Sequence, residues 1–130
     1  MVFTQAEIEF LEQQPIGRFG TVGPNDDPQI RPVGVHLAED RRTVDVVGHA
    51  LAATQKWRNV LRNPRVAFLV DSVESVDPPV ARGIEIRGVA EPLRDAVDSS
   101  GGLSGEVIRI HPRRIISWGL DSPRPVGRDV

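Results

Sequence analysis

The sequence predicts a mainly β protein, a small six-stranded antiparallel barrel with two short helices. The 130 residues include 12 glycines and 11 prolines, so turns are frequent and the connections are short. Runs of strand-forming residues recur between these turns, and two other stretches have helical patterns. An antiparallel sheet of this size closes into a barrel because closure removes its exposed edges.

A short amphipathic helix is expected at the start of the chain, over residues 4–14. Thr4 and Glu7 have the spacing of a capping box, in which each side chain bonds the other residue's backbone N–H. Ile8, Phe10 and Leu11 then form an apolar stripe, and the proline at position 15 ends the helix. Such a helix is typical of a cover over one open end of a barrel.

The strands are recognised by alternating or continuous apolar residues between turn signals. They are expected at residues 16–22, 29–37, 43–48, 65–70, 82–91 and 106–118. Pro32 places the second strand at an edge or bulge, because proline cannot donate a ladder hydrogen bond. The run at 65–70 lacks alternation, which predicts burial on both faces. We expect His111-Pro112 to interrupt the last strand, residues 1–121 to form the domain, and residues 122–130 to be a disordered tail.

The second helix, within residues 48–64, is the strongest candidate for a functional site. No carboxylate lies between Asp45 and Asp71, yet four cations do: Lys56, Arg58, Arg62 and Arg65. Lys56 is the only lysine in the chain. A helix N-terminus attracts anions, so cations placed there indicate a bound negative group. The alternative is a solvated cationic face on a helix whose core side carries Ala53, Trp57, Val60 and Leu61.

Composition excludes several other kinds of site. The chain has no cysteine, which removes thiolate catalysis and Cys-based metal sites. Its three histidines have no evident carboxylate partner and no metal-ligand spacing. A net charge of −2 disfavours nucleic acid as a partner. No segment has the pattern of a membrane span or signal peptide, so a cytoplasmic protein is expected.

Several stretches together resemble a known family. They are residues 16–22 (IGRFGTV), 29–34 (QIRPVG), 53–59 (ATQKWRN), 62–68 (RNPRVAF), 82–88 (RGIEIRG) and 108–115 (IRIHPRRI). The chain resembles the pyridoxamine 5'-phosphate oxidase-like (PPOX) family of FMN- and F420-binding split β-barrel proteins. Within that family it is most similar to the small actinobacterial branch that uses coenzyme F420. The resemblance extends to Asp121, and the helix with its Arg-Asn-Pro-Arg-Val exit is its most specific part.

The resemblance implies a homodimer with a cofactor and a small-molecule substrate at the subunit interface. Lys56 and Arg58 would meet the cofactor phosphate, with Thr54 and Gln55 donating hydrogen bonds beside them. The residues expected around the ring system are Arg31, Pro32 and Val33 along one side, Gly48 and His49 at its edge, and Trp118 from the second subunit. No metal site is implied.

Three functions follow from this site. The first is an F420-dependent reductase that passes a hydride to an electron-poor small molecule, because the phosphate and acidic oligoglutamate tail of F420 suit a cationic segment. The second is an FMN-dependent flavin oxidoreductase, whose single phosphate requires fewer cations. The third is a non-catalytic carrier, since the chain has no clear general acid. Any enzyme of this kind depends on its cofactor for the chemistry.

Overall fold

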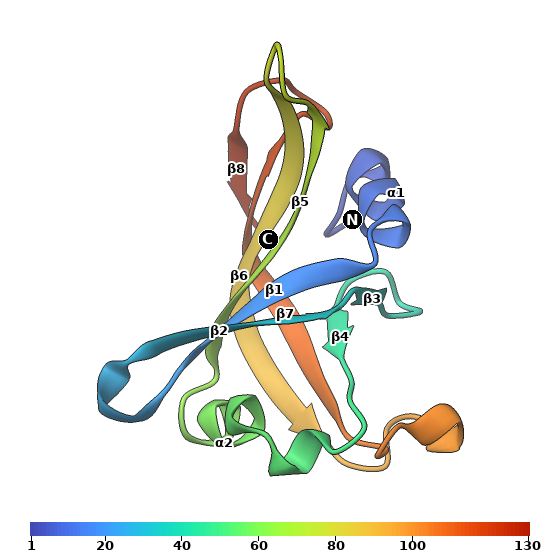
Figure 1. The fold of residues 1–130 in the computed structure, drawn as a ribbon, viewed down its shortest axis with the longest axis vertical. Helices are drawn as coiled ribbons and strands as arrows, with labels where there is room; N and C mark the ends of the chain where they lie inside the picture. The colour runs from blue at the N-terminus through green and yellow to red at the C-terminus, as the bar shows by residue number, and fades with distance from the viewer.

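All 130 residues are described by a computed structural model, in which the strands form one antiparallel sheet (Figure 1). The strands are β1 (Ile16–Val22), β2 (Pro28–Gly34), β3 (His36–Leu37), β4 (Val44–Val46), β5 (Arg65–Ser75), β6 (Val80–Leu93), β7 (Val107–Trp118) and β8 (Val126–Asp129). The helices are α1 (Gln5–Gln13) and α2 (Gln55–Arg62), with short 3-10 turns η1 (Pro24–Asp26), η2 (Leu51–Ala53) and η3 (Ser100–Gly102).

The order of the strands curls the sheet into a split barrel. The pairing order is β2-β1-β5-β6-β7-β4-β3, with β8 paired to β7. Only Val35 separates β2 from β3, yet these strands lie at opposite ends of the order, so the sheet must bend back on itself. Figure 1 shows β1 and β2 crossing the long strands β5, β6 and β7 steeply. The predicted antiparallel split β-barrel is confirmed, although the sheet has eight strands and not six.

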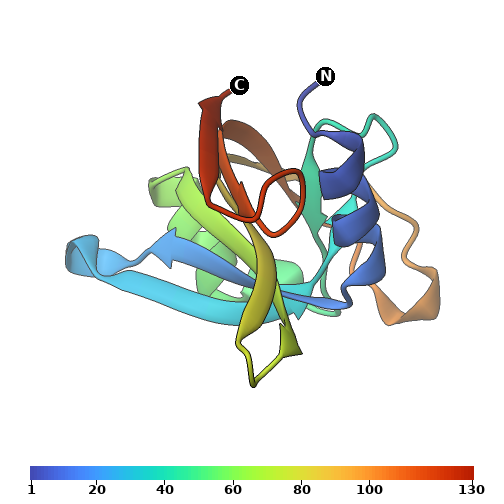
Figure 2. The same ribbon diagram turned by 90° about the horizontal axis from the view of Figure 1, so that it is seen from above.

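The C-terminal residues differ from the prediction. The tail was expected to be disordered from residue 122, but residues 126–129 form β8 against β7, with Gly127 opposite Ile116. Arg128 on β8 extends to α1 and bonds the buried Glu7. Figure 2 shows the two chain ends on the same side of the molecule. The contact of Arg128 with Glu7, which is far away in the sequence, stabilises the C-terminal strand. The composition of the tail did not predict this contact.

The long strands β5 and β6 extend further than predicted, and β7 lacks the predicted interruption. β5 continues to Ser75, which shortens the expected loop at 71–81. β7 passes through His111-Pro112 without a break, because a bulge shifts its register against β6 between Arg87 and Gly88. A side chain at position 88 would collide with the carbonyl of His111, so glycine allows the close approach.

The core lies inside the curl of the sheet. Phe19 and Phe68 are fully buried there, with ring centroids 6.5 Å apart. β5 alternates, since Phe68 and its second neighbours point inward while Ala67 and Leu69 are partly exposed. Within one subunit the strand is therefore buried on its inner face only, and the prediction that its outer face is covered at a subunit interface stays a prediction.

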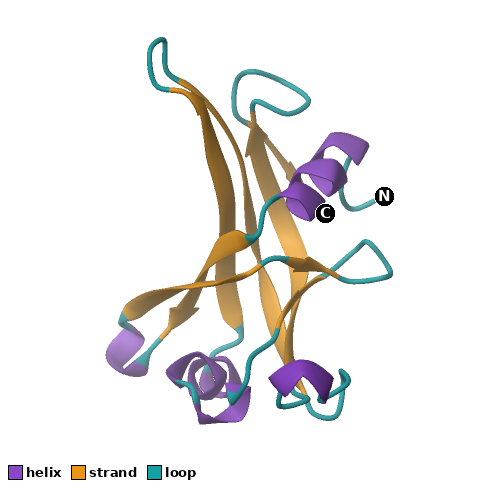
Figure 3. Ribbon diagram, turned by 45° about the vertical axis from the view of Figure 1, so that its right-hand side comes forward, coloured by secondary structure: helices purple, strands orange, loops and turns teal.

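Two helices flank the sheet at different places (Figure 3). The predicted capping box of α1 is present, and α1 buries its apolar stripe beside β3. α2 lies at the end where the η turns gather, with Trp57 and Val60 buried. Leu61 was expected in the core but is 59% exposed, and Asn59 is buried in its place. No helix has the length and hydropathy needed to cross a bilayer.

Candidate anion-binding site

The start of α2 is defined by a local cap. Thr54 precedes the helix in an extended conformation, and its hydroxyl oxygen accepts a hydrogen bond from the backbone N–H of Trp57 at 3.3 Å. The same hydroxyl donates to the carbonyl of Leu51 at 2.6 Å. Thr54 was expected to donate to a ligand, but its only proton is already used within the chain. Its role in the structure is to begin the helix.

Lys56, in the first turn of α2, lies close to Arg31 on β2. Arg31 is opposite the buried Phe19 and shares a strand face with Gln29, which α2 contacts. Burial lowers the pKa of the Lys56 ammonium below its usual value, and the positive charge of Arg31 lowers it further. Neither side chain takes part in an ion pair. Two neighbouring cations without a counter-charge favour a bound anion.

The backbone adds donors at the same place. The N–H groups of Gln55 and Lys56 have no acceptor within the protein, whereas the next two N–H groups bond Thr54. The free groups lie at the positive end of the helix dipole. Arg31, Lys56 and these two amides together have the chemistry of a phosphate-binding site.

Arg58 and Gln55 lie beside this site but are engaged with other protein groups. The Arg58 guanidinium donates to the carbonyl of Ala53 at 3.1 Å and to Oε1 of Gln55 at 2.9 Å. The amide nitrogen of Gln55 donates to Oδ1 of Asn59 at 2.8 Å. The predicted group thus divides into Lys56, which is free to meet an anion, and two neighbours that are held by internal hydrogen bonds.

The residues expected along the ring system lie on β2 and in the segment between β4 and α2. Val33 faces the core and is 9% exposed, while Pro32 is exposed on the opposite face of β2. Gly48 accepts hydrogen bonds from the backbone N–H and the hydroxyl of Ser104. His49 Nδ1 lies 2.8 Å from the carbonyl of Gly102. The segment before α2 is thus docked against the loop that follows β6.

Trp118 is remote from Lys56 within one chain. It pairs with Gly83 near the start of β6, whereas the ring of Trp57 on α2 lies beneath Arg94, just after the end of β6. The guanidinium carbon of Arg94 is 5.3 Å from the centroid of that ring. The structure therefore does not bring Trp118 to the other predicted site residues.

A second cationic feature, not predicted from the sequence, lies on the outer face of the sheet. A groove of about 890 Å³ is lined by Ile30, Ala67 and Val89, by three arginines at positions 65, 87 and 113, and by no carboxylate. These arginines come from three strands, so the strand register decides that they meet. Neither Lys56 nor Arg31 lines the groove. The candidate anion site is the place where these two unpaired cations meet, and the groove is a separate feature.

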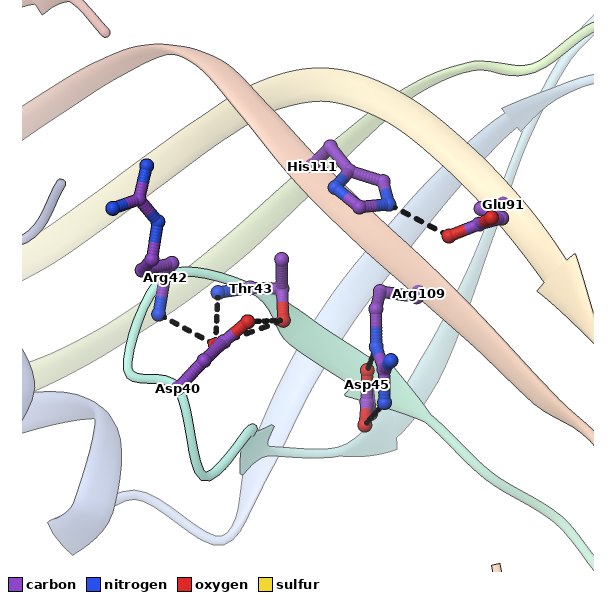
Figure 4. A network of polar contacts seen from close by, with 7 residues as sticks. All are labelled: Asp40, Arg42, Thr43, Asp45, Glu91, Arg109 and His111. Carbon is purple, nitrogen blue, oxygen red and sulfur yellow. Dashed lines mark hydrogen bonds and ion pairs between the residues drawn. The ribbon is translucent and has the colours of Figure 1, made fainter. Parts of the chain in front are cut away.

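Figure 4 shows the polar contacts around β4 and β7. Asp45 holds Arg109 through two hydrogen bonds of 2.9 and 3.0 Å, and Asp40 bonds Thr43 in the preceding turn. His111 Nε2 lies 2.9 Å from Glu91, so the expectation that the histidines lack a carboxylate partner was wrong for His111. Both members of that pair are exposed. No group of three metal-ligating side chains is present.

The fold and the sequence define the class of protein. The model of the pyridoxamine 5'-phosphate oxidase family matches residues 3–119, and the chain belongs to this family. A relative from Streptomyces rimosus subsp. rimosus, a 5a,11a-dehydrotetracycline/5a,11a-dehydrooxytetracycline reductase, is 41% identical over the whole chain and 94% of its own length.

Solved structures share the fold. A conserved hypothetical protein from Mycobacterium tuberculosis matches with a TM-score of 0.71 and 23% identity, covering 91% of this chain and 86% of that one. A structure described as an F420 reductase matches with a TM-score of 0.64 and 22% identity, covering 82% of this chain and 93% of the other.

Proposed function

We propose that the protein is a reductase that uses the deazaflavin coenzyme F420. The main observation behind this proposal is that Lys56 and Arg31 lie close together beside two free backbone N–H groups. No carboxylate neutralises the two cations. A cofactor phosphate supplies the missing negative charge. The sequence relative that is named as a reductase supports an oxidoreductase role for the family site.

The residues of this chain bind and orient the cofactor. Lys56 and Arg31 would hold the phosphate, and the free N–H groups of α2 would donate to its oxygens. By the resemblance to the family, Pro32, Val33, Gly48 and His49 would border the ring system. When bound, reduced F420 supplies a hydride to an electron-poor double bond, and solvent supplies the proton. No side chain at the site is placed as a general acid, so catalysis depends on orientation.

The proposed role of Trp118 requires a second copy of the chain. Trp118 is too far along β6 and β7 to contact a ligand at Lys56 of its own subunit, so it reaches the cofactor only across a dimer interface. Such an interface would also cover exposed apolar side chains such as Ile30, which is 59% exposed. We therefore propose a homodimer with its two cofactors between the subunits.

The substrate class follows from the relative. A dehydrotetracycline is a polycyclic compound with a conjugated double bond next to a carbonyl group, and a substrate of that kind accepts a hydride. Two alternatives keep the same site. FMN would place its single phosphate at Lys56 and Arg31, and a carrier would bind the cofactor without turnover.

Titration with F420 and FMN tests the proposal and separates these alternatives. Binding of F420 at micromolar concentrations, with turnover of a dehydrotetracycline, supports the reductase. A protein that is yellow as purified and has a flavin absorption spectrum supports FMN, and binding without turnover of any electron-poor acceptor supports the carrier. Failure to bind either cofactor overturns all three.

Lys56→Ala tests the position of the phosphate. Loss of a charge-assisted contact should weaken F420 binding by about 1.5–3 kcal/mol, or roughly 10–150-fold. Arg62→Ala is the matched control, because Arg62 is a cation of the same helix whose guanidinium bonds the carbonyl of Val22. The control should bind F420 as the parent does. Unchanged affinity in Lys56→Ala would mean that the phosphate lies elsewhere.

A further inference from the structure

Asn59 is a fully buried polar side chain at the centre of the contact between α2 and the sheet. Its exposure is 0%. The amide nitrogen donates one proton to Oγ1 of Thr21 at 2.9 Å and the other to Oε1 of Gln29 at 2.8 Å. The amide oxygen accepts from Nε2 of Gln55 at 2.8 Å. Both donor protons are used and the acceptor is occupied, which a buried amide requires.

Through the bond to Gln29, this network connects α2, which carries Lys56, with β2, which carries Arg31. Gln29 lies two residues before Arg31 on the same face of β2, and Gln55 immediately precedes Lys56 in the first turn of α2. Thr21 and Gln29 are directly opposite each other on β1 and β2. The amide nitrogen of Asn59 therefore bonds Thr21 and Gln29, a pair on neighbouring strands. The amide oxygen bonds the side chain of Gln55 at the start of α2.

The position of β2 needs such support. β2 is an edge strand that pairs only with β1, so its outer side has no ladder to hold it. Lys56 and Arg31 repel each other when no anion is bound, which pushes β2 away from α2. The bond from Asn59 to Gln29 is the side-chain hydrogen bond that joins these two elements directly.

We propose that Asn59 is a positioning residue, which holds Arg31 at its place beside Lys56 through Gln29 and so prepares the anion site before a ligand arrives. The anion itself touches Arg31 and Lys56, and Asn59 acts through them. The proposal deepens the proposed function and rests on it for the identity of the ligand. The arrangement of the two cations is a property of the ligand-free protein.

Two substitutions separate positioning from general stability. Gln29→Met removes the acceptor on β2 and leaves the bond from Asn59 to Thr21 intact. Thr21→Val removes the acceptor on β1 and leaves the bond to Gln29 intact. Each variant loses one hydrogen bond from the same amide, so both should lose a similar amount of thermal stability. Only Gln29→Met frees β2 from α2.

The single lysine provides a direct readout. Protein labelled with 13C- and 15N-lysine gives one side-chain signal, because Lys56 is the only lysine in the chain. In Gln29→Met we expect that signal to titrate at higher pH than in the parent, since separation of β2 from α2 reduces both the burial of Lys56 and the field of Arg31. In Thr21→Val the titration should match that of the parent. Equal titration in the parent and both variants, or an equal shift in both variants, would overturn the proposal.

Cofactor affinity is the second readout. Gln29→Met should weaken binding of F420 or FMN by about tenfold, and Thr21→Val should leave it unchanged. If the parent binds neither cofactor, the proposed function fails, whereas the lysine titration still decides the role of Asn59. If Gln29→Met does not fold, Gln29→Asn serves as the second variant, because its shorter side chain withdraws the acceptor while keeping it polar.

Discussion

The ion pair between Glu7 and Arg128 is the contact whose removal should change stability most clearly. Glu7 is completely buried, and its carboxylate accepts from Nη1 and Nη2 of Arg128 at 3.0 and 2.6 Å. Arg128 also donates to the carbonyl of Val2 at 2.7 Å. Arg128→Met keeps the aliphatic volume but leaves the carboxylate without its cation. Breaking a buried pair in this way costs about 3–5 kcal/mol, and we expect about 3 because Arg128 is 33% exposed.

The pH dependence of this variant provides a sharper test. Burial raises the pKa of Glu7, but its hydrogen bonds with Arg128 and the Thr4 backbone outweigh burial and hold the pKa below its ordinary 4.5. In the parent, the pair therefore contributes stability above about pH 4.5, which is lost as the pH falls through the folded pKa. Without Arg128, burial is opposed only by the hydrogen bonds of Glu7 with the Thr4 backbone and the Ser117 side chain, and the pKa of Glu7 should rise. The stability difference between parent and variant should then shrink as the pH falls from 7.

Urea unfolding followed by tryptophan fluorescence, repeated from pH 7 to pH 4, measures both effects. The control is Glu7→Gln with Arg128→Met, because glutamine preserves the capping box and removes the buried charge. The double variant should recover much of the lost stability and show a smaller change of the difference with pH. A cost below about 1 kcal/mol, the range of an exposed pair, would refute the reasoning, as would a pH-independent difference.

Three further predictions concern other contacts. Arg31→Gln should raise the pKa of Lys56 toward its ordinary value without reaching it, because burial remains; NMR titration of the single lysine measures this, and an unchanged titration would contradict it. Asp45→Asn should destabilise the fold by about 1.5–3 kcal/mol, since it removes the charge that holds Arg109; thermal unfolding with Glu39→Gln, a change at an exposed carboxylate, as the surface control measures the loss. Glu106→Met should increase hydrogen exchange in the segment before α2, because it removes the carboxylate that accepts the backbone N–H of Ala52 there; unchanged protection would show that this bond does not hold the segment.

Much of the fold could be predicted because its signals are local. The capping box of Thr4 and Glu7 depends on residues three positions apart, and Pro32 indicates an edge or a bulge because of its own missing N–H. The exit of α2 is likewise set by Asn63 and Pro64, which follow its last turn. The predictions that were wrong depended on distant residues. The exposure of Leu61 and the burial of Asn59 depend on which side of α2 meets β1 and β2.

The candidate site shows the same division. The carboxylate-free segment around Lys56 is visible in the sequence, and so is Arg31 within a motif of the resembled family. That these two side chains are neighbours depends on the register of β1 with β2 and on the packing of α2. That Thr54 and Arg58 are held by other protein groups depends on the geometry of one helical turn and its cap, which composition does not describe.

By itself, the sequence determined the class of fold, the start of α1, an edge or bulge at Pro32 and the segment that carries the unpaired lysine. Each depends on backbone preferences and side-chain bonds over a few residues. Only the tertiary structure decided that Arg128 orders the C-terminal strand by bonding Glu7, that three arginines share an outer groove, and that Asn59 joins the two cationic elements. These contacts require the sheet to curl and its register to be set, because they join residues far apart along the chain, such as positions 7 and 128.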